Sequence, residues 1–248
     1  TFASLGFLDN ESYLSGNSLR RYSARLNLDY NITDNLKVGI SSSGSYVRNN
    51  KISAAWEGGL GTVQSTALPY YGVNDQNSDF GNPVVRSNSV DWRTIEQRTI
   101  NTARLEYRPV KNLTIVANGS LDYMDLGDNF FEDSTWTGFF SIGKEYQSKI
   151  TNWNTNGFAQ YDFNMLPEKH RLSVMAGSEA QNYRQRSSYQ EVSDVNTHLY
   201  LDWEGSDNSD TLDITNPTVR YTFASFFGRA NYVFDNRYTF KACLRVDG

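Results

Sequence analysis

The sequence predicts an all-β fold, and more narrowly part of the wall of an antiparallel transmembrane β-barrel of the outer-membrane type. Three observations lead to this prediction. Apolar and polar residues alternate over stretches that reach the roughly 9–11 residues a membrane-spanning strand needs. Short and long connections alternate along the chain, which places the short ones at one rim of an antiparallel barrel and the long ones at the other. Aromatic residues gather beside a short connection, where membrane barrels place an interfacial girdle.

The composition limits the other possibilities. The chain has 248 residues and a net charge of −5, so it lacks the basic footprint of a nucleic-acid-binding protein. Its mean hydropathy of −0.59 and the lack of any run of 18 apolar residues exclude a spanning helix, whereas the lipid-facing residues of a spanning strand are diluted by polar neighbours. The single cysteine, Cys243, excludes a disulfide framework.

The first three strands are expected at about residues 1–9, 19–30 and 36–48. The second has the clearest alternation, with Tyr22 to Tyr30 in even positions on one face and arginine, serine, asparagine and aspartate on the other. A five-residue turn, NITDN, then joins it to the third strand, where Leu, Val and Ile restart the apolar face.

Two further hairpins follow the same pattern. The strands of the first are expected at about 97–107 and 113–123, joined by the short turn RPVKN. The strands of the second are expected at about 152–163 and 172–181, around the turn MLPEK. In each strand, leucine, isoleucine, alanine and aromatic residues occupy one face and polar residues the other, which is typical of a sheet with one wet side.

The last hairpin, within Ser225–Gly248, is the most regular. Its strands are expected at about 224–234 and 238–247, with a two-residue break at Asp235-Asn236. The turn end carries four aromatic residues, which are Tyr232, Phe234, Tyr238 and Phe240. The prediction therefore counts nine strands, an odd number that cannot close a bacterial barrel by itself, so we expect an incomplete wall.

Three long segments without a sustained period separate the hairpins. They are expected as extracellular loops at about residues 49–94, 127–149 and 185–221 of a single partial barrel domain, 1–248. Their aromatic residues argue against disorder. A soluble β-sandwich would not ordinarily sort its connections by length or sustain strands this long, so the membrane barrel is the favoured interpretation.

Four stretches carry a resemblance to a known family: RRYSARLNLDYNITDNLKVGI, LEYRPVKNLTI, HRLSVMAGSEAQ and FFGRANYVFDNRYTFKACLRVDG. They resemble the SusC/RagA-type TonB-dependent transporters of Bacteroidetes, and the last stretch is the most specific. The resemblance implies a 22-stranded barrel, a SusD-type lipoprotein lid, energy from the TonB complex and import of oligosaccharides or peptides. It also implies that the plug, the TonB box and the remaining strands lie outside this sequence.

Two sets of residues are candidates for function. Rings in the long loops can stack on sugars or anchor a partner, or can simply pack the loops together: Trp56, Tyr70, Tyr71, Trp92, Trp136 and Trp203. Charges on the polar face can guide solute through a lumen, or can merely pair across strands: Arg21, Arg25, Lys37, Arg104, Glu106, Asp122, Asp162, Arg229, Lys241 and Arg245.

Catalytic, cofactor and metal sites are not expected. The two histidines, His170 and His198, lie far apart in the sequence, and Glu179 has no evident acid–base partner. Three functions stay open: an active outer-membrane importer of oligosaccharides or peptides, a passive porin or adhesin barrel, and a soluble all-β glycan-binding domain or enzyme. A siderophore transporter of the same barrel class is a further alternative, although the resemblance is to the nutrient transporters. The active importer is the favoured function. It predicts a multi-pass outer-membrane protein in contact with lipid.

Overall fold

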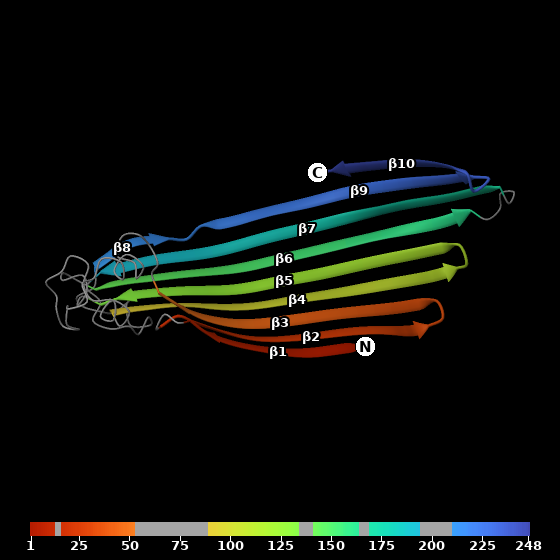
Figure 1. Ribbon diagram of the computed structural model, residues 1–248. Coiled ribbons are helices and arrows are strands. Elements are labelled where there is room, and N and C mark those ends of the chain that lie inside the picture. Colours follow the sequence, from red (N-terminus) through yellow and green to blue (C-terminus); the bar gives the residue numbers. More distant parts are fainter. Residues whose placement is uncertain (13–15, 53–88, 134–140, 164–168, 194–209) are drawn as a thin grey trace.

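One antiparallel sheet makes up the fold. The computed structural model describes residues 1–12, 16–52, 89–133, 141–163, 169–193 and 210–248, and the sheet is shown in Figure 1. Its strands are β1 (Phe2–Glu11), β2 (Ser18–Thr33), β3 (Leu36–Lys51), β4 (Val90–Val110), β5 (Leu113–Glu132), β6 (Ile142–Phe163), β7 (His170–Ser193), β8 (Asp210–Thr215), β9 (Thr218–Phe234) and β10 (Tyr238–Asp247). No helix within the described ranges has the length and apolarity to cross a membrane.

The order of strands in the sheet follows the order in the chain. Nine strands form the path β1-β2-β3-β4-β5-β6-β7-β9-β10, which confirms the nine strands expected from the sequence. The tenth, β8, pairs only with the end of β7, at Tyr189 to Ser193, and falls inside the segment expected as a loop at 185–221. Within the described residues β1 and β10 do not pair with each other, so the sheet is an open wall.

The turns are tight, and they differ in detail from the prediction. Thr33 pairs with Leu36 and Val110 with Leu113, so each of these turns has two residues rather than five. The last turn has three residues instead of two. Asp235 and Asn236 have φ of 53° and 52°, and the Arg237 N–H donates to the Phe234 carbonyl at 3.0 Å. Positive φ at both central positions matches the right-handed twist of the flanking strands.

The middle strands are much longer than the alternating pattern indicated. Strands β4 to β7 have 21, 20, 22 and 24 residues, so strand extends into all three segments expected as loops at 49–94, 127–149 and 185–221. Polar residues occupy both faces there, as in Gln185–Glu191 of β7. Backbone pairing continues although the apolar period has ended, because ladder hydrogen bonds do not require an apolar face.

The two faces of the sheet can be followed residue by residue, because directly paired residues share a face. One row across eight strands is polar, and we call it the polar row: Asp29, Gly39, Arg104, Asn118, Asn156, Glu179, Ser225 and Asp247. The neighbouring row points to the other face and is the apolar row: Tyr30, Val38, Leu105, Ala117, Gly157, Ser178, Phe226 and Val246. We call the two faces the polar face and the apolar face.

The sheet has almost no core of its own. Among the described residues the buried hydrophobic side chains are Val116 and Val192, whereas Leu5, Phe226 and Leu244 are 89%, 70% and 72% exposed. A soluble sandwich would bury such residues against a second layer. The apolar face of the described sheet therefore needs an apolar environment beyond the sheet itself.

Aromatic residues mark two levels on the apolar face. Tyr22 and Tyr30 lie eight residues apart on β2, as do Trp153 and Tyr161 on β6. We call the level of Tyr22 and Trp153 the upper aromatic level and that of Tyr30 and Tyr161, nearer the short turns, the lower aromatic level. At about 3.4 Å per residue this separation is about 27 Å along a strand, or about 20 Å across a bilayer for a tilt near 40°. The apolar band of outer-membrane barrels, about 25 Å tall between its girdles, is similar. Near the last turn, the stacked pairs Tyr232–Phe240 and Phe234–Tyr238, with ring centroids 6.4 and 6.5 Å apart, continue the lower level.

Candidate functional site

The polar face is the candidate functional surface. The strand registers place all ten predicted charged residues on this one face of the sheet, across β2, β3, β4, β5, β6, β9 and β10. They are Arg21, Arg25, Lys37, Arg104, Glu106, Asp122, Asp162, Arg229, Lys241 and Arg245. A face that carries so many charges is compatible with water and not with lipid.

Several of these charges form ion pairs, either with one another or with other charged residues of the sheet. Arg98 on β4 contacts Asp122 on β5 at 2.6 Å through two hydrogen bonds, a fork-like arrangement that suits an arginine–carboxylate pair. Arg104 and Arg108 flank Glu106 at 3.5 and 2.6 Å on the same strand. Ion pairing within the sheet, the alternative to guiding solute, therefore accounts for some of the ten predicted charges.

The densest polar network surrounds Glu179. Its carboxylate accepts a hydrogen bond from the Asn154 side chain at 3.0 Å and pairs with Arg245 at 3.1 Å. Arg245 also donates to Asp247 at 2.7 Å and to the Ser225 hydroxyl at 2.8 Å. This cluster links β6, β7, β9 and β10, so it fixes four strands on the wet side of the wall.

A shallow hollow of about 490 Å³ lies on the polar face over β2, β3 and β4. Three arginines, Arg21, Arg25 and Arg98, and one carboxylate, Glu96, line it together with serines of β2 and β3. Guanidinium groups can contact anionic or hydroxyl-bearing solutes through several donors each.

Two members of this surface were not identified from the sequence in these roles. Arg98 lies at the start of the predicted strand at 97–107, where the alternation has only begun, and it is not among the ten predicted charges. Its even position on the strand, shared with Arg104 and Glu106, was the available signal. The sequence shows no partner for Glu179, because Asn154 and Arg245 are distant in the sequence and only the strand order brings them together.

Trp92 is the one predicted loop aromatic that falls within the described residues, and it lies in β4 rather than in a loop. Its indole N–H donates to Asp128 at 2.8 Å, its ring meets Phe130 edge to face at 5.9 Å, and the Lys51 ammonium lies 4.8 Å from its centroid. The other five, Trp56, Tyr70, Tyr71, Trp136 and Trp203, lie outside the described residues.

Metal and catalytic groups were not expected, and the described residues contain no group of three or more His, Cys, Asp or Glu that could hold a metal ion. His170 contacts Tyr232, with its Nδ1 within hydrogen-bond distance of the phenol oxygen. His198 lies outside the described part of the chain. Cys243 is a free and exposed thiol.

Comparison with curated proteins finds two informative relatives. The chain is 22% identical over 260 residues to the TonB-dependent receptor P26 of Formosa agariphila, covering 100% of this chain and 26% of the relative. It is 23% identical over 281 residues to the TonB-dependent receptor SusC of Bacteroides thetaiotaomicron, covering 99% of this chain and 27% of that relative. The chain thus spans about a quarter of the length of these relatives. No family model matches it.

Solved structures show the same fold. The RagAB peptide transporter superposes with a TM-score of 0.80 at 20% identity, over 99% of this chain and 30% of that one. The ferric preacinetobactin receptor BauA of Acinetobacter baumannii superposes with a TM-score of 0.58 at 12% identity, over 97% of this chain and 35% of that one.

The sheet therefore has the fold of part of the barrel wall of a TonB-dependent receptor. Within that class, the two curated relatives and the structural likeness to RagAB support the resemblance to SusC/RagA-type TonB-dependent transporters that the sequence carries. These relatives are receptors and a peptide transporter.

Proposed function

We propose that this chain is part of the wall of a multi-pass outer-membrane barrel that imports oligosaccharides or peptides with energy from TonB. A SusD-type surface lipoprotein is the proposed partner at the outer rim. The chain spans only about a quarter of the length of its curated relatives. The proposal therefore includes a plug and a TonB-binding segment in a longer gene product.

One observation supports this proposal most strongly: the sheet is apolar and exposed on one face, and polar and internally paired on the other. Lipid covers the first face at no desolvation cost, and the second lines a water-filled passage. We propose that the ten charged residues of the polar face, from Arg21 to Arg245, face this lumen. Trp92 and the five other predicted aromatics, from Trp56 to Trp203, stay candidates for contact with ligand or partner.

The peptide alternative is supported by a structural neighbour, and the oligosaccharide alternative rests on the sequence resemblance alone. The neighbour RagAB is a peptide transporter. Aromatic rings bind the apolar faces of sugars and anchor peptide side chains alike, so their presence does not choose between the two ligands.

The experiment uses the full-length gene product in its native host. The gene is deleted and restored, and uptake of a labelled oligosaccharide mixture and a labelled peptide mixture is measured with and without a protonophore. We expect energy-dependent uptake of one mixture that disappears on deletion, together with a lipoprotein that co-purifies in detergent. Uptake that survives the protonophore would favour a passive porin, and a barrel without uptake an adhesin. A chain found only in the soluble fraction would contradict the membrane assignment altogether.

A further inference from the structure

The apolar face carries an unexpected group of four cations just beyond the upper aromatic level. Lys149 on β6 lies directly opposite Arg186 on the neighbouring strand β7. Arg184 on β7 likewise lies opposite Arg220 on β9. Arg184 and Arg186 are two residues apart and share a face, so the four side chains form one patch across three strands. We call it the four-cation patch; all four residues are exposed.

The described residues place too little negative charge nearby to balance the patch. Asp125 on β5 pairs with Lys149 at 3.5 Å. Within the part of the chain that the structure describes, no ion pair is formed by Arg184, Arg186 or Arg220. Four cations less one carboxylate leave three positive charges uncompensated by the residues that the structure describes. Directly opposed like charges on a sheet are destabilising, which favours an anion between them.

The level of the patch identifies the kind of anion. Asn182 is paired with Trp153, which belongs to the upper aromatic level, and Arg184 is the next residue of β7 on the same face. Aromatic girdles sit at the height of lipid headgroups. Arg184 and Arg220 therefore lie at or just above the headgroups on the lipid-facing side of the wall, on the rim opposite the short turns.

We infer that the four-cation patch binds the phosphate-bearing headgroup of an outer-leaflet lipid. Guanidinium groups bind phosphate oxygens with two parallel hydrogen bonds, and two such groups facing each other can hold one phosphate from both sides. The inference rests on the proposed function only for its placement of the sheet in the membrane, and not for import or energy coupling.

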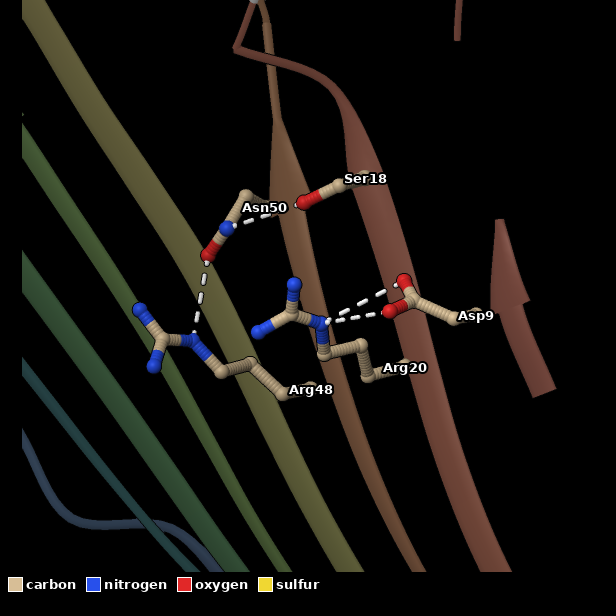
Figure 2. A network of polar contacts seen from close by, with 5 residues as sticks. All are labelled: Asp9, Ser18, Arg20, Arg48 and Asn50. Carbon is tan, nitrogen blue, oxygen red and sulfur yellow. Dashed lines mark hydrogen bonds and ion pairs between the residues drawn. The ribbon is translucent and has the colours of Figure 1, made fainter. Parts of the chain in front are cut away.

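A second arginine pair on the same face provides a matched control. Arg20 on β2 and Arg48 on β3 are also directly paired and also lie two residues beyond the upper aromatics. Each has a partner, as Figure 2 shows: Arg20 donates to the Asp9 carboxylate at 3.1 and 3.3 Å, and Arg48 donates to the Asn50 side-chain oxygen at 3.4 Å. Asn50 in turn donates to Ser18 at 3.0 Å. Both arginines of this pair therefore have hydrogen-bond partners within the protein.

The test compares the double variants R184Q/R220Q and R20Q/R48Q, which remove the same charge from the same face at the same level. Each variant of the full-length protein is purified in detergent and titrated with phosphatidic acid or phosphatidylcholine, and bound lipid is counted by native mass spectrometry. We expect the wild type to retain phosphatidic acid preferentially. R184Q/R220Q should weaken this binding about tenfold or more, because two charge-assisted contacts to phosphate are lost. R20Q/R48Q should change it less than about twofold, because those arginines already have partners.

Three results would overturn the inference: equal losses in both variants, no preference for phosphatidic acid, or displacement of the lipid by equimolar inorganic phosphate. The last would mean that the patch recognises free phosphate rather than a lipid. Outer-membrane fractionation of the same variants is done first. A protein missing from the outer membrane defeats the proposed function, whereas a protein present there but indifferent to lipid defeats only the lipid site.

Discussion

The polar row and the apolar row are one residue apart along every strand they cross, and they differ in almost every physical respect. Asn118 of the polar row donates to Asn156 at 2.8 Å, and Glu179 is held by Asn154 and Arg245. The apolar row has no such contacts among its described residues and exposes Leu105 and Phe226 at 39% and 70%. The polar face is organised by contacts within the chain, whereas the apolar face is left to be organised by its surroundings.

The largest effect is expected from placing a charge on the wrong face. Ala103 and Thr102 are neighbours on β4, and Ala103 lies on the apolar face midway between the two aromatic levels. Ala103→Arg should destabilise the full-length barrel in lipid vesicles by about 2–4 kcal/mol, as arginine does near the bilayer midplane. The measurement is a urea titration of vesicle-inserted protein followed by tryptophan fluorescence.

Thr102→Arg is the control for that change. It adds the same side chain to the polar face one residue away, and we expect a loss below about 1 kcal/mol, as for most surface substitutions. Equal losses in the two variants would contradict the assignment of the faces.

The next largest effect concerns a glycine on the polar face. Gly177 is paired with Phe158 on one side and Phe227 on the other, and a Cβ added there would lie 2.5 Å from the Gly157 carbonyl oxygen and 2.6 Å from the Phe227 ring. The rings leave room only for hydrogen at this position. Gly177→Val should cost about 1–3 kcal/mol through overpacking.

Gly127 is the matched position, because a Cβ there meets nothing within 4 Å. Gly127→Ala in the same titration should be nearly neutral. If Gly177→Val were tolerated as well as Gly127→Ala, the side-chain packing on the polar face would be looser than the structure shows.

A chemical probe can distinguish the faces without a stability measurement. Cys243 lies on the polar face, opposite Arg229, and Leu244 lies on the apolar face at 72% exposure. A polar, membrane-impermeant maleimide should label Cys243 of the vesicle-inserted barrel readily. In the double variant C243S/L244C, labelling should be at least about tenfold slower, since a thiol in hydrocarbon does not ionise to the reactive thiolate. In detergent-free unfolded protein the two rates should become equal, and a difference that persisted there would invalidate the comparison.

The smallest effect is expected from a carboxylate at the end of the sheet opposite the short turns, beyond the upper aromatic level. The pKa of Glu191 is lowered by the hydrogen bond from the Tyr189 hydroxyl and by Lys144, whose ammonium is 3.1 Å away. A carboxyl with a lowered pKa stabilises the fold above its ordinary pKa, and this stabilisation is lost as the pH falls through the lowered value. Glu191→Gln should therefore cost less than about 1 kcal/mol at neutral pH, since the pair is partly exposed. The difference from wild type should vanish in strongly acidic buffer, and a constant difference at all pH values would contradict the ionic explanation.

Much of the fold follows from the sequence, because the apolar period reports directly on contact with lipid. The strands at 19–30, 113–123 and 224–234 were recognisable since one face must be apolar for their whole length in the membrane. The same reasoning explains what was missed. The outer ends of β4 to β7 carry polar residues on both faces, and β8 has only six residues, so their pairing leaves no sustained period in the sequence.

The candidate site could be predicted only in part, for a different reason. Which residues face water follows from alternation, and the ten charged residues do share one face. Which of them pair depends on register between strands. The Arg98–Asp122 and Glu179–Arg245 pairs span 24 and 66 positions of the sequence, and a shift of one residue in register would turn each partner to the other face.

The order of strands has a consequence for how such a wall is made. From β1 to β7 every strand pairs with the next one along the chain, so each new hairpin adds to an edge that already exists. Contacts of this kind close few long loops, which favours assembly one hairpin at a time. Yet with two buried hydrophobic side chains in its described residues, the growing sheet gains little by collapsing in water. Its folding is therefore inseparable from its insertion, and until then the apolar edges and faces must be kept from aggregating by something other than the chain itself.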